Sequence, residues 1–222
     1  MKHFFLFCSA FFCLCLSACF TITEEITLQA NGSGSVKTSV DMSEMMNMLG
    51  MFLPDTLKKD LDISKILSGD TQSFKKMEGI SNMKVNSEKP YHYVVSFDFA
   101  NADALNRALS STSDSGAGKM LEAMKSQYRI KKRSLQRQTS IDQKLLPAEL
   151  KGTQFEEAES MMQFINSPTY QVIYHLPKKT KKVTINDKGG TLSKDENTVS
   201  IQYNLLDFVK NNGNIMDHCI KF

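Results

Sequence analysis

The chain has no tryptophan, and its few cysteines are unevenly placed. Five cysteines occur in 222 residues, and four of them lie at positions 8, 13, 15 and 19. Cys219 stands alone among the later residues, which excludes a framework of internal disulfides there. After residue 20 no apolar run approaches the roughly 20 residues that a membrane-spanning helix needs. We therefore expect a body without disulfides and without a transmembrane helix.

Strong charge of either sign is also missing, and so are the common catalytic motifs. The chain carries 27 basic and 24 acidic residues, a balance that argues against a nucleic-acid partner. No G-x-S-x-G elbow is present. The stretch Gly116-Ala117-Gly118-Lys119 lacks the first glycine of a phosphate loop, and Met120 replaces its Ser or Thr. The sequence thus predicts no enzyme and no cofactor.

What the sequence does have is a leader. A basic start at residues 1–3 precedes an almost wholly apolar stretch, Phe4–Leu16, which has the length of the core of a secretion signal. The residues Leu16-Ser17-Ala18-Cys19 that follow resemble the lipobox of bacterial lipoproteins. That resemblance implies cleavage before Cys19, a diacylglyceryl thioether on its sulfur, and a fatty acyl group, such as palmitate, on its new amino group. Cleavage after Ala18 by an ordinary signal peptidase, giving a soluble secreted protein, is the alternative.

The lipobox resemblance also bears on where the protein lies. It implies a lipid-anchored protein of the bacterial cell envelope, because two or more acyl chains hold a protein on a bilayer almost permanently. Phe20 follows Cys19 where some inner-membrane lipoproteins have an acidic residue. This favours the outer membrane.

Alternating apolar and polar residues predict several strands and hairpins after the leader. The expected strands cover 22–28, 36–40, 80–85, 91–99, 169–175, 183–185, 198–203 and 215–222, with an exposed or edge strand within 127–141. Helices are expected after Asp41, after Asn101, over 55–67, 147–166 and 205–211, and as a turn within 119–125. A Ser- and Gly-rich loop covers 110–118. We divide the chain into a signal peptide (1–18), an N-terminal lobe (19–166) and a C-terminal lobe (167–222), and one continuous domain is the alternative.

Three strand ends share a pattern. A strand meets Asp or Asn and then an apolar residue in Val40-Asp41-Met42, in Phe97-Asp98-Phe99 and in Tyr203-Asn204-Leu205. A short polar side chain there can end a strand and cap the helix that follows. The pattern predicts an α+β fold of ββα-like units, in which helices pack on one face of antiparallel sheets.

Parts of the sequence resemble a known group of proteins. The segments EEITLQANGSGSVKTSVDMSEM, YQVIYHLPKKTKKVTINDKGG and TVSIQYNLLDF are similar to LppM-type and related uncharacterised bacterial lipoproteins. The resemblance covers about half of the mature chain. It implies a membrane-anchored α+β domain without known enzymatic chemistry and with envelope or glycolipid binding at most, and it assigns no catalytic residue.

Candidate metal ligands are few. Met42, Met45, Met46, Met48 and Met51 offer soft thioethers for Cu(I), but their helical spacing with a leucine favours packing. Three histidines, at positions 92, 175 and 218, lie on three different expected strands, without the spacing of a zinc site. No metal is predicted. Cys219 alternates with polar residues and is expected to be a small buried hydrophobe rather than a reactive thiol.

Two basic clusters are the other candidate sites. The first contains Arg129, Lys131, Lys132, Arg133 and Arg137, and the second contains Lys178, Lys179, Lys181 and Lys182. Each cation near an anionic membrane contributes about 1 kcal/mol, so the clusters fit an anionic lipid, glycan or protein. The alternative is that they serve solubility and protect an edge strand.

The sequence therefore predicts a lipid-anchored envelope protein with a non-enzymatic binding or scaffolding role. A binding module for lipid, glycolipid or an apolar peptide is one alternative. An envelope hydrolase without a recognisable motif is another.

Overall fold

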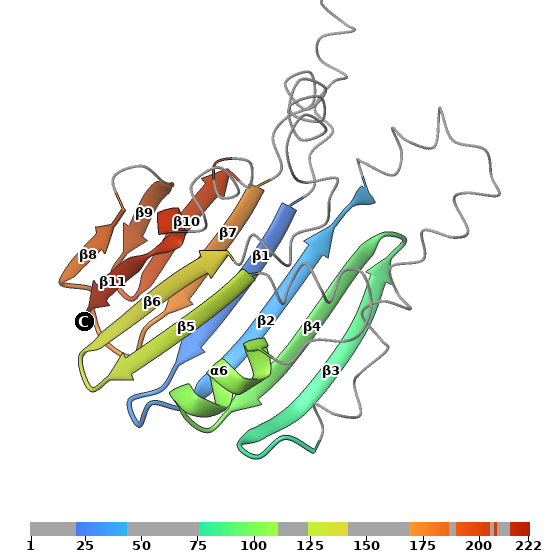
Figure 1. Cartoon of the computed structure of the whole chain (residues 1–222), viewed down its shortest axis with the longest axis horizontal. Coiled ribbons are helices and arrows are strands. Elements are labelled where there is room, and N and C mark those ends of the chain that lie inside the picture. The colour runs from blue at the N-terminus through green and yellow to red at the C-terminus, as the bar shows by residue number, and fades with distance from the viewer. Residues whose placement is uncertain are drawn as a thin grey trace, which may run out of the picture.

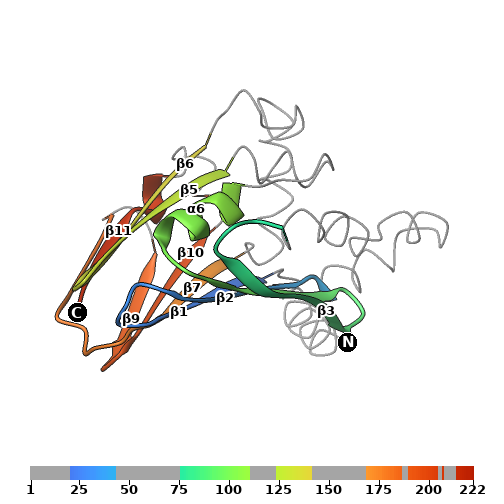
Figure 2. The same cartoon turned by 90° about the horizontal axis from the view of Figure 1, so that it is seen from below.

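The computed structural model describes residues 21–43, 76–110, 124–141, 169–186, 190–204, 207 and 214–222. Within these ranges the chain forms eleven β-strands in two sheets, one α-helix and one short 3-10 helix (Figure 1). The two sheets lie one over the other as separate layers, and the helix lies beside the smaller one (Figure 2).

The larger sheet, here sheet A, has seven strands in the order β3-β4-β2-β1-β7-β10-β9. β1 and β7 run parallel, and every other neighbouring pair is antiparallel. The strands are β1 (Thr21–Leu28), β2 (Gly34–Asp41), β3 (Ile80–Lys89), β4 (His92–Phe99), β7 (Thr169–His175), β9 (Thr191–Asp195) and β10 (Thr198–Asn204).

The smaller sheet, sheet B, has four antiparallel strands in the order β5-β6-β11-β8. The strands are β5 (Met124–Lys131), β6 (Ser134–Ile141), β8 (Lys182–Ile185) and β11 (His218–Lys221). The 3-10 helix η2 (Asn214–Met216) leads into β11. In both sheets, strands that precede residue 166 pair with strands that follow residue 167.

The predicted α+β class is wrong, because strands dominate the described structure. α6 (Ala102–Ser110) is the one α-helix within the described ranges, and it packs against β5. Sheet B, rather than a layer of helices, covers the inner face of sheet A. The physical reason lies in segment 124–141, whose alternating buried positions Tyr128, Leu135 and Arg137 form a full hairpin that β11 extends.

Only the middle one of the three expected ββα-like units is present as such in the described ranges. After β4, the Asn101 side chain accepts a hydrogen bond from the Ala104 backbone N–H at 2.9 Å and so caps α6. After β2, Asp41 accepts one from the Ser43 N–H at 2.9 Å. The helices expected to follow Asp41 and Asn204 lie outside the described residues.

The first hairpin agrees with its prediction. β1 and β2 pair from Thr21↔Asp41 to Leu28↔Gly34, around a turn where Asn31 accepts a hydrogen bond from the Ser33 N–H. Gly34 faces Phe99 of β4, and a Cβ on Gly34 would stand 2.7 Å from the Phe99 ring. The ring can therefore cover the strand only because residue 34 has no side chain.

Several other predictions fall outside the described residues. They concern the helices over 55–67, 147–166 and 205–211 (apart from Asp207), the helical turn at 119–123, the loop at 111–118 and Met45–Met51. The exposed strand expected in 127–141 is instead the β5–β6 hairpin, and β9 was not predicted. No helix in the described part of the chain is long and apolar enough to cross a bilayer.

Candidate functional site

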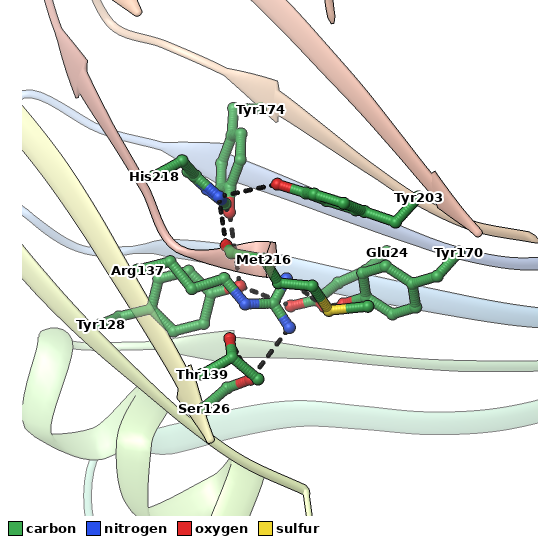
Figure 3. A network of polar contacts seen from close by, with 10 residues as sticks. All are labelled: Glu24, Ser126, Tyr128, Arg137, Thr139, Tyr170, Tyr174, Tyr203, Met216 and His218. Atoms are coloured by element: carbon green, nitrogen blue, oxygen red, sulfur yellow. Dashed lines mark hydrogen bonds and ion pairs between the residues drawn. The ribbon is translucent and has the colours of Figure 1, made fainter. Parts of the chain in front are cut away.

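The inner faces of the two sheets meet around a cluster of polar side chains, which we call the polar network (Figure 3). Sheet A contributes Glu24 from β1, Tyr170 and Tyr174 from β7, and Tyr203 from β10. Sheet B contributes Ser126, Tyr128, Arg137, Thr139 and His218, and Tyr128, Arg137 and His218 are direct cross-strand neighbours. Each of them occupies an inward position of its strand, because the alternation along a strand fixes which side chains face the other layer.

A carboxylate and a guanidinium form the centre of the network. Arg137 Nη1 lies 3.4 Å from Glu24 Oε2, and the two side chains are 5% and 6% exposed. The Tyr128 hydroxyl donates to Glu24 Oε1 at 3.0 Å, and the Tyr170 hydroxyl donates to Glu24 Oε2. Glu24 thus receives two phenol hydrogen bonds and one ion pair, which stabilise its charge without solvent.

The guanidinium of Arg137 lies between two aromatic rings. Its central carbon is 5.3 Å from the Tyr128 ring centroid and 5.2 Å from the Tyr170 ring centroid. Its Nη2 donates to Ser126 Oγ at 2.9 Å. Burial works against the charged form of Arg137, but the Tyr128 oxygen and the Glu24 carboxylate raise its pKa above the ordinary value. The site therefore holds a permanent positive charge in cation–π contact with both rings.

His218 forms the second half of the network, and its contacts fix its tautomer. Nδ1 lies 2.7 Å from the Met216 carbonyl oxygen, which can only accept, so Nδ1 carries the proton. The Tyr174 hydroxyl then donates to Nε2 over 2.6 Å, and the Tyr203 oxygen lies 3.1 Å from Nδ1. Burial and the nearby Arg137 charge lower the pKa of His218 to about 3, so the imidazole is neutral at physiological pH.

The phenols of the network stay protonated. Burial raises the pKa of Tyr128, Tyr174 and Tyr203 above the ordinary value, although the Arg137 charge works against this rise in each case. Protonated phenols are hydrogen-bond donors and weak nucleophiles. Tyr128 and Tyr170 therefore donate hydrogen bonds to Glu24, and Tyr174 donates one to His218.

The arrangement is suited to joining the two sheets. Glu24, Arg137, Thr139 and His218 are all buried, and so are the network tyrosines. The Thr139 N–H is itself bonded to the Asp217 carboxylate at 2.7 Å. Arg137 Nε and Nη1 have no hydrogen-bond partner among the described residues, and Nη1 forms only the ion pair with Glu24. A buried charge pair of this kind costs desolvation energy but permits few alternative packings. The network thus fixes how sheet B lies on sheet A.

The structure brings the two predicted basic clusters together on sheet B. Lys131, Ser134, Lys221 and Lys182 are successive partners across its four strands. Lys132 and Arg133 form the β5–β6 turn beside this row, and Lys181 precedes β8. Eight predicted cations are exposed: Arg129, Lys131, Lys132, Arg133, Lys178, Lys179, Lys181 and Lys182. Arg137 is the exception, because it points inward and joins the polar network.

Other candidate residues are not brought together. His92, His175 and His218 lie on β4, β7 and β11, and the described ranges contain no cluster of three His, Cys, Asp or Glu side chains fit for a metal. Met42 is half-buried, and the other four methionines of its group, like Cys19, are outside the described residues. The expectation that Cys219 is a buried hydrophobe is wrong: its free thiol is half-buried on the outer face of sheet B, between Gln136 and Thr184.

Sequence reasoning missed Glu24 and Arg137 as partners. The signal was available, because Glu24 shares the inward side of β1 with Ile26, and Arg137 shares that of β6 with Leu135. Charges of opposite sign at core positions of two strands indicate an ion pair between layers. The pairing itself needs the three-dimensional structure, since the two residues are 113 positions apart in the sequence.

Comparison with known proteins gives one distant similarity. No family model matches the chain, and no curated protein matches it by sequence. Among solved structures, the chain is similar to the NMR structure of the folded domain of LppM from Mycobacterium tuberculosis, with 8% sequence identity and a TM-score of 0.42. The alignment covers 92% of this chain and 89% of that one. At this level the resemblance to an LppM-type lipoprotein is weak and concerns the course of the chain alone.

Proposed function

We propose that this chain is a lipid-anchored protein of the bacterial cell envelope whose β body binds a partner and catalyses no reaction. The observation that carries the proposal is Leu16-Ser17-Ala18-Cys19, directly after an apolar leader. β1 begins at Thr21, two residues after Cys19, and lies in the middle of sheet A. The anchor would therefore attach to the core of the body through a very short tether.

The polar network supports a binding role over catalysis. A catalytic group must reach substrate, yet the ionisable members of the network are buried and bonded to one another. His218 contacts two phenols and a carbonyl oxygen rather than the Ser126 hydroxyl. An apolar ligand has less support, because Leu192 is the one exposed large hydrophobic side chain among the described residues.

The test of the anchor is metabolic labelling of the full chain with an alkyne fatty acid, in the wild type and in Cys19→Ser. We expect label on the wild type only, and we expect the labelled wild type to enter the detergent phase of a Triton X-114 partition with Cys19 as its first residue. An N-terminal peptide that begins after residue 19, or equal partition of both proteins into water, would overturn the proposal. Turnover in a panel of ester, amide and glycoside substrates would overturn its non-enzymatic part if one substitution abolished it.

A further inference from the structure

The outer face of sheet B, together with the β5–β6 turn, forms a surface that we call the basic face. Its cations come from three separate parts of the sequence, and the cross-strand register places Lys131, Lys221 and Lys182 in one row. Neighbouring strands are about 4.8 Å apart, so the row spans about 14 Å. The basic face consists of Lys125, Arg129, Lys131, Lys132, Arg133, Lys181, Lys182 and Lys221, all exposed.

Among the described residues, no acidic side chain of the basic face would neutralise these charges. The other outward positions of sheet B whose side chains are described are Gln127, Ser134, Gln136, Gln138, Ser140, Thr184 and Cys219. None of these is acidic, aromatic or a large aliphatic residue. Among the described residues, the ion pair nearest in sequence is Lys179 Nζ–Glu196 Oε1 at 3.7 Å, which lies in the loops beside the face.

Most of the basic face lies at the end of the body that is remote from the proposed anchor, and Lys125, near the start of β5, is the exception. β1 starts at Thr21 and runs parallel to β7, with Thr27 paired to His175. The chain leaves β7 at that far end and reaches Lys181 and Lys182 within a few residues. Eight residues of strand extend over about 23 Å. In Figure 1 the β5–β6 turn and the C-terminus lie at the lower left, opposite the start of β1.

The short tether keeps the basic face from the anchoring leaflet. One residue, Phe20, separates Thr21 from Cys19, and the two chain steps between them reach at most about 7 Å. Thr21 belongs to sheet A, and packed sheets lie about 10 Å apart, with the outward side chains of sheet B beyond that. If the body rested on the basic face, Thr21 would be held farther from the leaflet than the tether reaches. The partner therefore lies away from the membrane that holds the protein.

We propose that the basic face binds a linear anionic polysaccharide, carrying carboxylate or phosphate groups, that lies away from the anchoring leaflet. A flexible polyanion can be held by charge alone, through release of its counterions. A protein partner would need an apolar or aromatic centre, and single-stranded nucleic acid would need aromatic platforms, both of which the described face lacks. The orientation rests on the proposed lipid anchor, whereas the binding itself does not.

The test uses the full acylated protein in phosphatidylcholine nanodiscs and titrates it with polygalacturonate and with phosphorylated dextran. The test variant is Lys131→Glu/Arg133→Glu/Lys182→Glu/Lys221→Glu. The control variant, Lys37→Glu/Lys84→Glu/Lys89→Glu/Lys194→Glu, makes the same change in net charge at exposed positions of sheet A. We expect the test variant to lose about tenfold or more in affinity and the control to change less than about twofold. Neutral dextran should not bind, and added salt should weaken the wild type.

Two further measurements test the place of the binding site and its distance from the membrane separately. Bound polysaccharide should slow alkylation of Cys219, the free thiol on the same face. Phosphatidylglycerol added to the nanodiscs should leave the affinity unchanged, because the face lies more than a Debye length from the leaflet. Equal losses in both variants, tighter binding to an oligonucleotide or an acidic polypeptide, or competition by the anionic leaflet would overturn the proposal. Polysaccharide binding by a wild-type protein that carries no acyl group on Cys19 would refute the anchor alone.

Discussion

At the scale of single residues, the main feature of this protein is a charge pair sealed between two sheets. Arg137 belongs to a basic run in the sequence, and local charge assigns it to the surface with its neighbours. Arg137 instead points inward, like Leu135 two positions earlier, because successive side chains of a strand alternate between its two faces whatever their charge. Glu24, 113 positions earlier, is the only acidic residue that the described part of the chain brings to it as an ion-pair partner.

Glu24→Gln should lower the free energy of unfolding by about 3 kcal/mol, because the Arg137 charge then stays buried without its counter-charge. The measurement is urea denaturation followed by far-UV circular dichroism. Glu25→Gln is the matched control, since Glu25 faces the other side of β1 and is half-buried. A loss below about 1 kcal/mol for Glu24→Gln would show that the pair does not hold the two sheets together.

His218 should make stability depend on pH. Its pKa is about 3 in the fold and about 6.5 in the unfolded chain, so the unfolded chain binds more protons between these values. The contribution is complete above pH 6.5 and is lost as the pH falls toward 3, with a loss of about 2 kcal/mol at pH 5. Unfolding at several pH values should show a shallower slope for His218→Gln and an unchanged slope for His175→Gln. Parallel curves for all three proteins would contradict this.

At the scale of elements, most strands were predicted from the sequence, but the β5–β6 hairpin and β9 were not. The β1–β2 hairpin and β7 follow from clear alternation and turn residues, and α6 follows from Asn101 and its apolar spacing. The β5–β6 hairpin was missed because its turn residues, Lys132 and Arg133, are not typical of turns. The sequence therefore gives no signal that one strand ends there and another begins. β9 was missed because all its side chains are exposed, which leaves no apolar pattern to detect.

Gly34→Val should weaken the pairing of β1, β2 and β4. A Cβ at residue 34 would stand 2.0 Å from the Thr27 carbonyl oxygen and 2.7 Å from the Phe99 ring, so backbone or ring must move. Overpacking of this kind costs about 1–3 kcal/mol. Ser35→Val is the control, because residue 35 faces the opposite side of β2. Thermal unfolding should separate the two variants, and equal midpoints would mean that the ring moves freely.

At the scale of the whole molecule, the two sheets are built from both halves of the chain. β1 pairs with β7, and β6 pairs with β11, so neither sheet is complete until the C-terminal strands are in place. Local patterns predict strands but contain no information on which distant strands become neighbours. This is why a layer of helices was expected where sheet B lies, and why the two basic clusters could not be assigned to one surface from sequence alone.

The tyrosines allow the contact between sheet A and sheet B to be followed during unfolding. The chain has six tyrosines and no tryptophan, and four of the six belong to the polar network between the sheets. Near-UV circular dichroism therefore reports mainly on the contact of sheet B with sheet A, while far-UV signal reports on the strands. We expect both signals to disappear at the same urea concentration. Earlier loss of the near-UV signal would mean that the sheets separate before they unfold.

The place of β1 also decides how the body would withstand a pull through the proposed lipid on Cys19. β1 lies between β2 and β7, and its first residue, Thr21, follows Cys19 by two positions. Tension applied there acts along the strand axis and loads the hydrogen bonds to both neighbours in shear, all at once. A strand at the border of the sheet, pulled sideways, would instead peel off one bond after another. If the proposed lipid is present, the protein is thus held at its membrane through a strand that is bonded on both sides.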